Sequence, residues 1–131
     1  MSLAMRSVCC VAMAGCICLI QGCAPNVRQQ PTSALQAAPI PHRIQLDEAA
    51  NTRIGTGYRV DLKAGTTWQL VGGIAEGDVY KPLDQALNVE GSQVHEAYAV
   101  ISNSTLVGFY LPFEKTFVKV STQFPLSIHD K

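Results

Sequence analysis

The sequence predicts an all-β fold, either a small antiparallel sandwich or a partly open barrel of about seven short strands. Two observations lead to this prediction. From Gly57 onward, the chain consists of short runs rich in Val, Ile, Thr, Tyr and Phe that recur at intervals of about ten residues. The runs are separated by Gly, Pro, Asn or charged pairs, which are typical of turns.

The first two expected strands indicate which side chains face the interior. In the stretch 58–63, apolar side chains alternate with charged ones, which is the pattern of a half-buried strand. In the next run, "TTWQLVGGI", Trp68 and Leu70 share a face, and the two consecutive glycines predict a bulge or a sharp bend. The preceding segment 44–53 is expected to form one or two helical turns, with Asp47 as the cap.

Further strands are expected in the runs "DVYKP", "ALNVEG", "VHEAYAVIS", "LVGFYLPF", "TFVKVS" and "FPLSI". The runs 94–102 and 106–113 are apolar on both faces and are joined by "NST", so they are predicted to form a central hairpin covered on each side. The core is expected to contain Trp68, Leu70, Val79, Val100, Ile101, Leu106, Phe109, Leu111 and Phe117.

All five cysteines lie at or before position 23. Residues 7–22 have no charged side chain and follow Arg6, which is the arrangement of an export signal. Thiols so close together would close only small loops, which disfavours a disulfide framework. The paired spacing of a zinc site is also absent. The run is short for a permanent membrane span, which needs about twenty apolar residues.

The residues 20–23, "IQGC", resemble the lipobox of bacterial lipoprotein precursors, with an aliphatic residue at minus three and a small one at minus one. The resemblance implies that residues 1–22 are a signal peptide removed by signal peptidase II. It also implies that Cys23 becomes the lipidated first residue of the mature chain. A rival box at 13–16 would leave an apolar region of only about seven residues. In this class Ala24, rather than aspartate, implies the outer membrane, where we expect the domain to face the periplasm.

The segment after Cys23 is expected to be a flexible tether. Residues 24–42 contain four prolines together with Gln, Ala, Ser and Thr, and no aromatic residue. Such a composition buries too little apolar surface to offset the entropy cost of ordering. The predicted organisation is therefore a lipidated cysteine and tether at 23–43, followed by a β-rich domain at 44–131.

Charge and chemistry exclude several function classes. The formal net charge is zero and the cations are scattered singly, which disfavours nucleic acid as a partner. The three histidines, His42, His95 and His129, lie far apart in the sequence, and His95 and Glu96 would point to opposite faces of a strand. The sequence therefore predicts no catalytic residue, no cofactor and no metal site, and we expect no enzyme.

The side chains Trp68, Tyr110 and His95 are candidates for partner binding, since Trp and Tyr are enriched at protein interfaces. The alternative for the rings is core packing. Two functions are compatible with the sequence. One is a non-enzymatic, lipid-anchored accessory protein that docks to an envelope assembly for secretion, conjugation, pilus formation or cell-wall attachment. The other is a periplasmic module that binds a small ligand, peptide or glycan, or acts as an inhibitor.

Overall fold

The computed structural model describes residues 26–91 and 93–131, so the predicted signal peptide and Cys23 lie outside the described residues. The described chain forms thirteen strands and no helix, which confirms the predicted all-β class. The strands are β1 (Gln30–Pro31), β2 (Gln36–Ala37), β3 (Arg43–Leu46), β4 (Ala50–Arg53), β5 (Arg59–Leu62), β6 (Thr67–Ile74), β7 (Gly77–Pro82), β8 (Asn88–Glu90), β9 (Val94–Glu96), β10 (Tyr98–Ser102), β11 (Thr105–Leu111), β12 (Thr116–Pro125) and β13 (Ile128–Asp130).

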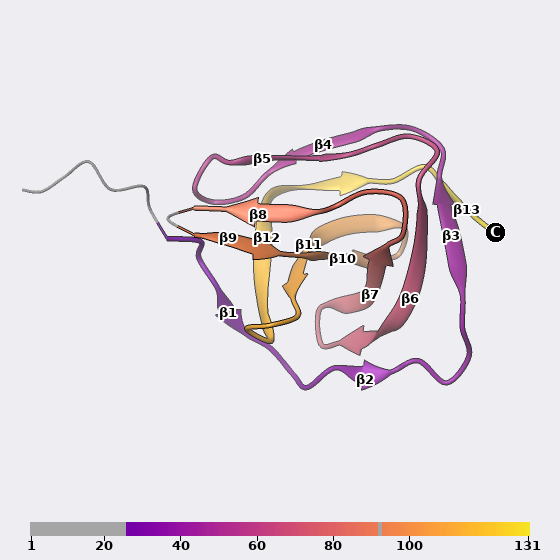
Figure 1. Ribbon diagram of the computed structural model, residues 1–131, viewed down its shortest axis with the longest axis horizontal. Helices are drawn as coiled ribbons and strands as arrows, with labels where there is room; N and C mark the ends of the chain where they lie inside the picture. Colours follow the sequence, from indigo (N-terminus) through magenta and orange to yellow (C-terminus); the bar gives the residue numbers. More distant parts are fainter. Residues whose placement is uncertain (1–25, 92) are drawn as a thin grey trace, which may run out of the picture.

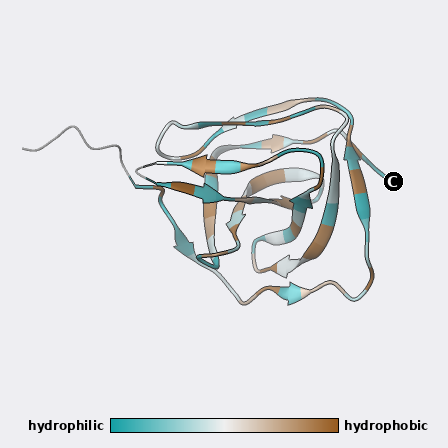
Figure 2. Cartoon of the chain, viewed as in Figure 1, coloured by the Kyte–Doolittle hydropathy of each residue, from teal (hydrophilic) through white to brown (hydrophobic). Residues whose placement is uncertain are grey.

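Nine strands form one antiparallel sheet in the order β1-β12-β11-β10-β7-β6-β3-β13, with β2 paired to β6 beside this path. Two hairpins, β4–β5 and β8–β9, form separate two-stranded sheets. The main sheet is strongly curled, with β4–β5 running across its upper rim and β8–β9 across its front (Figure 1). Brown and teal segments alternate along strands such as β3, as expected where one face of a strand is buried (Figure 2).

The central hairpin β10–β11 is covered on both faces, as the sequence predicts. Phe109 belongs to a large apolar cluster, whereas the next residue, Tyr110, packs on the opposite face with Val79, Val100 and Phe117. The turn of this hairpin consists of Asn103 and Ser104, which have φ angles of 51° and 60°. Two consecutive positive φ angles give the turn a twist that matches the flanking strands.

The predicted bulge in β6 is present, because the pairing register with β7 shifts between Leu70 and Gly72. At Gly72 the glycine is required for packing. A Cβ atom there would lie 2.3 Å from the carbonyl oxygen of Gln36. The missing side chain therefore allows β2 to approach β6 closely enough to pair with it.

The prediction of a flexible tether is wrong for residues 26–43. The strand β1 pairs with β12, β2 pairs with β6, and Val27 is only 5% exposed. Backbone hydrogen bonding and the burial of single apolar side chains such as Leu35 therefore order the segment despite its proline content. The described part of this segment belongs to the domain.

The prediction of helical turns at 44–53 is also wrong, since β3 and β4 occupy this segment. Ile44 and Leu46 are buried and alternate with more exposed residues, so the apolar period is two rather than 3.6. Most of the predicted core is confirmed. Trp68 is 2% exposed, and of the predicted core residues only Leu70 lies partly at the surface.

Candidate functional site: a groove between the β4–β5 hairpin and β12

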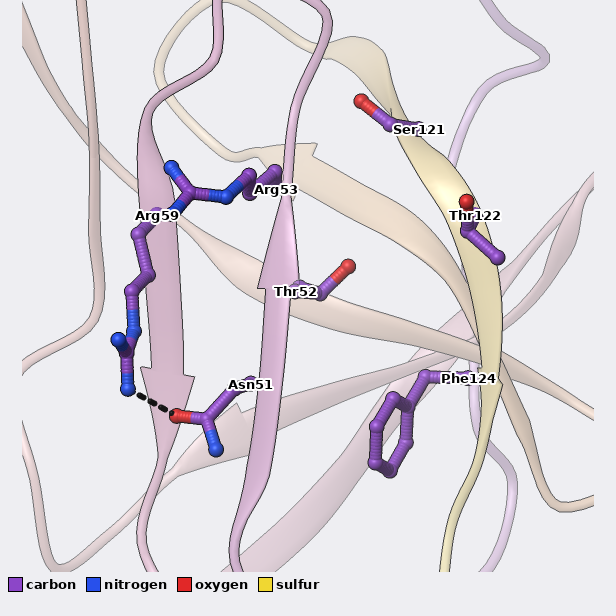
Figure 3. A pocket seen from close by; sticks show the side chains of 7 residues that line it. All are labelled: Asn51, Thr52, Arg53, Arg59, Ser121, Thr122 and Phe124. Carbon is purple, nitrogen blue, oxygen red and sulfur yellow. Dashed lines mark hydrogen bonds between the residues drawn. The ribbon is translucent and has the colours of Figure 1, made fainter.

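A groove of about 530 Å³ lies between the β4–β5 hairpin and β12. It has hydroxyl and amide groups on its walls, two arginines at one side and a single aromatic ring (Figure 3). Its lining consists of Asn51, Thr52, Arg53, Arg59, Ser121, Thr122 and Phe124.

The groove exists because β12 departs from its neighbour β11 over part of its length. Lys119 pairs with Gly108 and Phe124 pairs with Leu106, so the four residues 120–123 lie opposite the single residue Val107. On its other edge β12 pairs with β1 only at residues 116 and 117. Within the described chain, residues 121–123 therefore have no partner in a β-ladder.

The opposite wall is the outer edge of β4. This strand pairs with β5 along its whole length, and an isolated bridge between Ile54 and Val120 joins the hairpin to β12. Beyond this bridge, β4 and residues 121–123 of the described chain form no ladder. The groove thus lies between two strand edges, which are surfaces that can accept main-chain hydrogen bonds from another extended segment.

Two arginines give the groove positive charge. Arg53 and Arg59 are directly opposite each other in the β4–β5 register, an arrangement that costs stability because the like charges repel. Hydrogen bonds hold both side chains in place. Arg53 Nη1 donates to the Gly57 carbonyl at 2.8 Å, and Arg59 donates to Asn51 Oδ1 at 2.9 Å and to Asp61 Oδ1 at 2.8 Å.

The groove floor and walls add neutral polar groups and one apolar contact. Thr52 is 7% exposed, and its hydroxyl points from β4 toward β12 (Figure 3). Ser121 and Thr122 project from the unpaired part of β12. Phe124 is half-buried and directs its ring toward the β4 side (Figure 3). The site therefore combines hydrogen-bonding groups with a small apolar surface.

A second hollow of about 340 Å³ continues past the Ile54–Val120 bridge. Ser121 lines both hollows, and Arg28 and Lys119 line the second. Neither lining contains a carboxylate. Asp61, outside both linings, forms an ion pair with Arg59, so the cations left without a carboxylate on both sides of the bridge are Arg53, Arg28 and Lys119, and these favour an anionic ligand.

The three histidines form separate contacts with carboxylates outside the groove. None of the histidines lines the groove. Each lies beside a different carboxylate instead, namely His42 with Asp130, His95 with Glu114 and His129 with Asp47. In residues 26–91 and 93–131 there is no group of three or more His, Cys, Asp or Glu side chains that could hold a metal ion.

The structure places the three sequence-predicted partner residues away from this groove. Trp68, Tyr110 and His95 are 2%, 4% and 7% exposed, so their side chains contribute almost nothing to the described surface. His95 faces inward and Glu96 outward, as expected for neighbours on a strand. The partner of His95 is Glu114, whose Oε2 lies 2.7 Å from its Nδ1.

Sequence reasoning missed the groove itself. One signal was available in the segment "RIGTGYR", where two arginines flank a glycine-containing turn and therefore face each other across a hairpin. The contribution of β12 had no signal, because the run 116–125 has the composition of an ordinary strand and its excursion depends on the pairing with β11.

Within the described residues, no helix is long and apolar enough to cross a bilayer. The groove and the curled main sheet are the two features of the described residues that we compare with known proteins. No model of a known protein family, no curated protein sequence and no solved structure matches this chain.

Proposed function

We propose that this chain is a lipid-anchored, non-enzymatic accessory protein of the bacterial cell envelope, and that it docks to a partner protein through the β4–β12 groove. The resemblance of residues 20–23 to a lipobox supports the envelope location. One observation supports docking above all others. Two unpaired strand edges flank a groove, and Arg53 and Arg59 occupy directly opposite positions in the hairpin at its side.

The groove suits an extended segment of a partner better than a flat protein surface. An added strand could form main-chain hydrogen bonds with one of the two edges, either that of residues 121–123 or the outer edge of β4. Acidic side chains of that strand would pair with Arg53 and Arg59, since guanidinium groups bind carboxylates in a bidentate geometry.

A small ligand is the second candidate, because a volume of about 530 Å³ falls within the range of ligand pockets, roughly 300–1,000 Å³. The Phe124 ring offers a stacking surface for a sugar. The two candidates differ in a measurable way. A peptide strand would protect backbone amides of β4 or of β12 from hydrogen exchange, whereas a sugar stacked on Phe124 would protect few of them.

The docking proposal is tested by placing a photo-reactive amino acid at Thr122 in the full-length protein in its native host. We expect a discrete cross-linked product with one envelope protein. The double charge reversal Arg53→Glu with Arg59→Glu should reduce this product at least tenfold, because it repels an acidic segment. The matched control is Arg43→Glu, which reverses an exposed arginine on β3. Equal cross-linking in the double variant and the control would refute docking at this groove.

The anchor is tested separately by intact-mass analysis of protein extracted from membranes. We expect a mature chain that begins at Cys23 and carries the added mass of a diacylglyceryl group and an acyl chain. The variant Cys23→Ser should leave the precursor unprocessed. A native chain that retains its first methionine would contradict the anchor while leaving the groove as a docking site.

A further inference from the structure

The second hollow, past the bridge between the β4–β5 hairpin and β12, is formed by three separate segments of the chain. β12 contributes Lys119 and Ser121, the β4–β5 turn contributes Gly55, and the approach to β1 contributes Arg28. β1 and the closed end of the β4–β5 hairpin both lie beside β12 in the left half of the view (Figure 1). The three segments bring two cations, a hydroxyl group and a glycine to one place.

The pairing of β1 with β12 explains why the two cations meet. Gln30 pairs with Phe117 in an antiparallel register. Arg28 is two residues before Gln30 and Lys119 is two residues after Phe117, so the continuation of both strands carries the two cations toward the same hollow. Both side chains are exposed. Like charges on neighbouring strands repel each other, and a negatively charged ligand between them offsets this repulsion.

No carboxylate of the described chain neutralises these cations. The lining of the second hollow contains no Asp or Glu. Glu76 lies in another hollow on the other side of Lys119, where its carboxylate accepts a hydrogen bond from the Thr32 hydroxyl. In the part of the chain that the structure describes, neither Arg28 nor Lys119 forms an ion pair. Both charges are therefore available to a ligand.

The bridge between Ile54 and Val120 closes the gap between the two strands but leaves the surface above it open. Both residues of the bridge are 1% exposed, whereas their neighbours in the sequence on either side are exposed. At Gly55 a Cβ atom would meet no other atom within 4 Å. A partner segment bound in the groove can therefore pass over the bridge into the second hollow.

The positions of the cations on the two sides of the bridge match the repeat of an extended chain. Because the bridge is antiparallel, Arg53 lies toward Ser121 and Gly55 lies toward Lys119. Ser121 and Lys119 are alternate residues on the exposed face of β12, which places them about 7 Å apart. Alternate side chains of an extended partner segment have the same spacing. Two acidic side chains at alternate positions would thus reach Arg53 and Lys119 together.

We infer that the second hollow binds the continuation of the partner segment, and that this segment carries acidic residues at alternate positions. One carboxylate pairs with Arg53 in the groove, and the next pairs with Lys119 and Arg28 in the second hollow. The second contact strengthens the first, because it forms within a segment that is already held. This inference rests on the proposed function, and it adds the charge pattern by which the partner is recognised.

The test places a photo-reactive amino acid at Gln30 in the full-length protein in its native host. Gln30 is exposed and lines the second hollow but not the groove. We expect the protein captured from Thr122 to be captured from Gln30 as well. Mass spectrometry of the cross-linked peptide should show Asp or Glu at alternate positions. Ile40, which is 73% exposed and outside both linings, is the control position and should not give this product.

Charge variants test the two cations directly. Arg28→Glu with Lys119→Glu should lower the Gln30 product about tenfold, because like charges across an interface repel. The matched control is Arg43→Glu with Lys81→Glu, which reverses one exposed arginine on β3 and one exposed lysine on β7 and should leave the product unchanged. Since all four side chains are exposed, both double variants should fold like the parent, and thermal denaturation checks this.

The outcomes separate this inference from the proposed function. A product at Thr122 without the same product at Gln30 would refute the inference and leave docking at the groove in place. The inference is equally refuted if the cross-linked segment lacks alternate acidic residues, if Gln30 captures a lipid or a glycan instead, or if the two double variants cross-link equally. Absence of a product at both positions would refute docking at the groove and this inference with it.

Discussion

Trp68 shows how one residue joins three neighbouring strands of the main sheet. Its strand lies between β3 and β7, where Trp68 pairs with Ile44 on one side and with Pro82 on the other. The indole Nε1 donates to the Thr66 hydroxyl at 2.9 Å, so the buried N–H has a partner. The space left beside the ring is only about 10 Å³, which means that the ring fills its site.

Trp68→Ala should therefore lower the free energy of unfolding by about 3–5 kcal/mol, through lost burial and the cavity left behind. The measurement is urea denaturation followed by circular dichroism, because the variant lacks the only tryptophan of the chain. Trp68→Phe is the control and should cost clearly less. An alanine variant with an unchanged denaturation midpoint would contradict the core position of this ring.

The contact between the buried His95 and Glu114 is expected to contribute to stability. The exposed Glu96, next to His95 in the sequence, is expected to contribute little. Removing the carboxylate in Glu114→Ala leaves the ring nitrogen without its partner, 2.7 Å away in the native chain, and should destabilise the fold by about 1–3 kcal/mol. Glu96→Ala removes the same charge at a surface position of β9 and should change stability by less than about 0.5 kcal/mol. Equal effects in thermal denaturation would show that the contact contributes nothing.

At the scale of elements, β2 provides a sharp test, because two adjacent glycines of β6 differ in the space beside them. A Cβ at Gly72 would meet the Gln36 carbonyl oxygen at 2.3 Å, whereas the nearest atom at Gly73 would be 3.7 Å away. We expect Gly72→Ala to displace β2 and to speed hydrogen exchange in residues 34–38, at a cost of about 1–3 kcal/mol. Gly73→Ala should leave this exchange unchanged, and similar exchange in both variants would contradict the pairing of β2.

The elements that the sequence predicts well are those in which a local pattern agrees with the final pairing. The alternation in β5, the double glycine of β6 and the two apolar faces of β10 and β11 are local properties, so they can be read without knowing the neighbours. The segment 26–43 was misread because its order comes from distant partners on β12 and β6. The groove was missed for the same reason, since its opening depends on where β12 leaves β11.

For the whole molecule, the tyrosines set an alkaline limit on stability. Burial, with smaller contributions from nearby carboxylates, raises the pKa of Tyr58, Tyr80 and Tyr98 above the ordinary value of 10.0. The unfolded chain therefore releases these phenolic protons at a lower pH than the folded chain does. The resulting stabilisation is fully present below about pH 10, and stability falls as the pH rises above it.

We expect the free energy of unfolding to decline progressively above about pH 10, with a smaller decline in Tyr80→Phe, which has one fewer ionisable group in the interior. The measurement is denaturant unfolding at a series of alkaline pH values, together with the tyrosinate absorbance of the native protein. If parent and variant declined in parallel, Tyr80 would have no part in the alkaline transition.

The pairing of β13 with β3 has a consequence for how the chain acquires its structure. His129 contacts Asp47, 82 positions earlier, and Lys131 donates its backbone N–H to Arg43. Such distant pairings make folding slow, because loop closure must precede the contacts that reward it. A nascent chain cannot complete this edge of the sheet until residue 130 has left the ribosome. Until then this edge of the sheet remains without its last strand, which would favour the export that we propose.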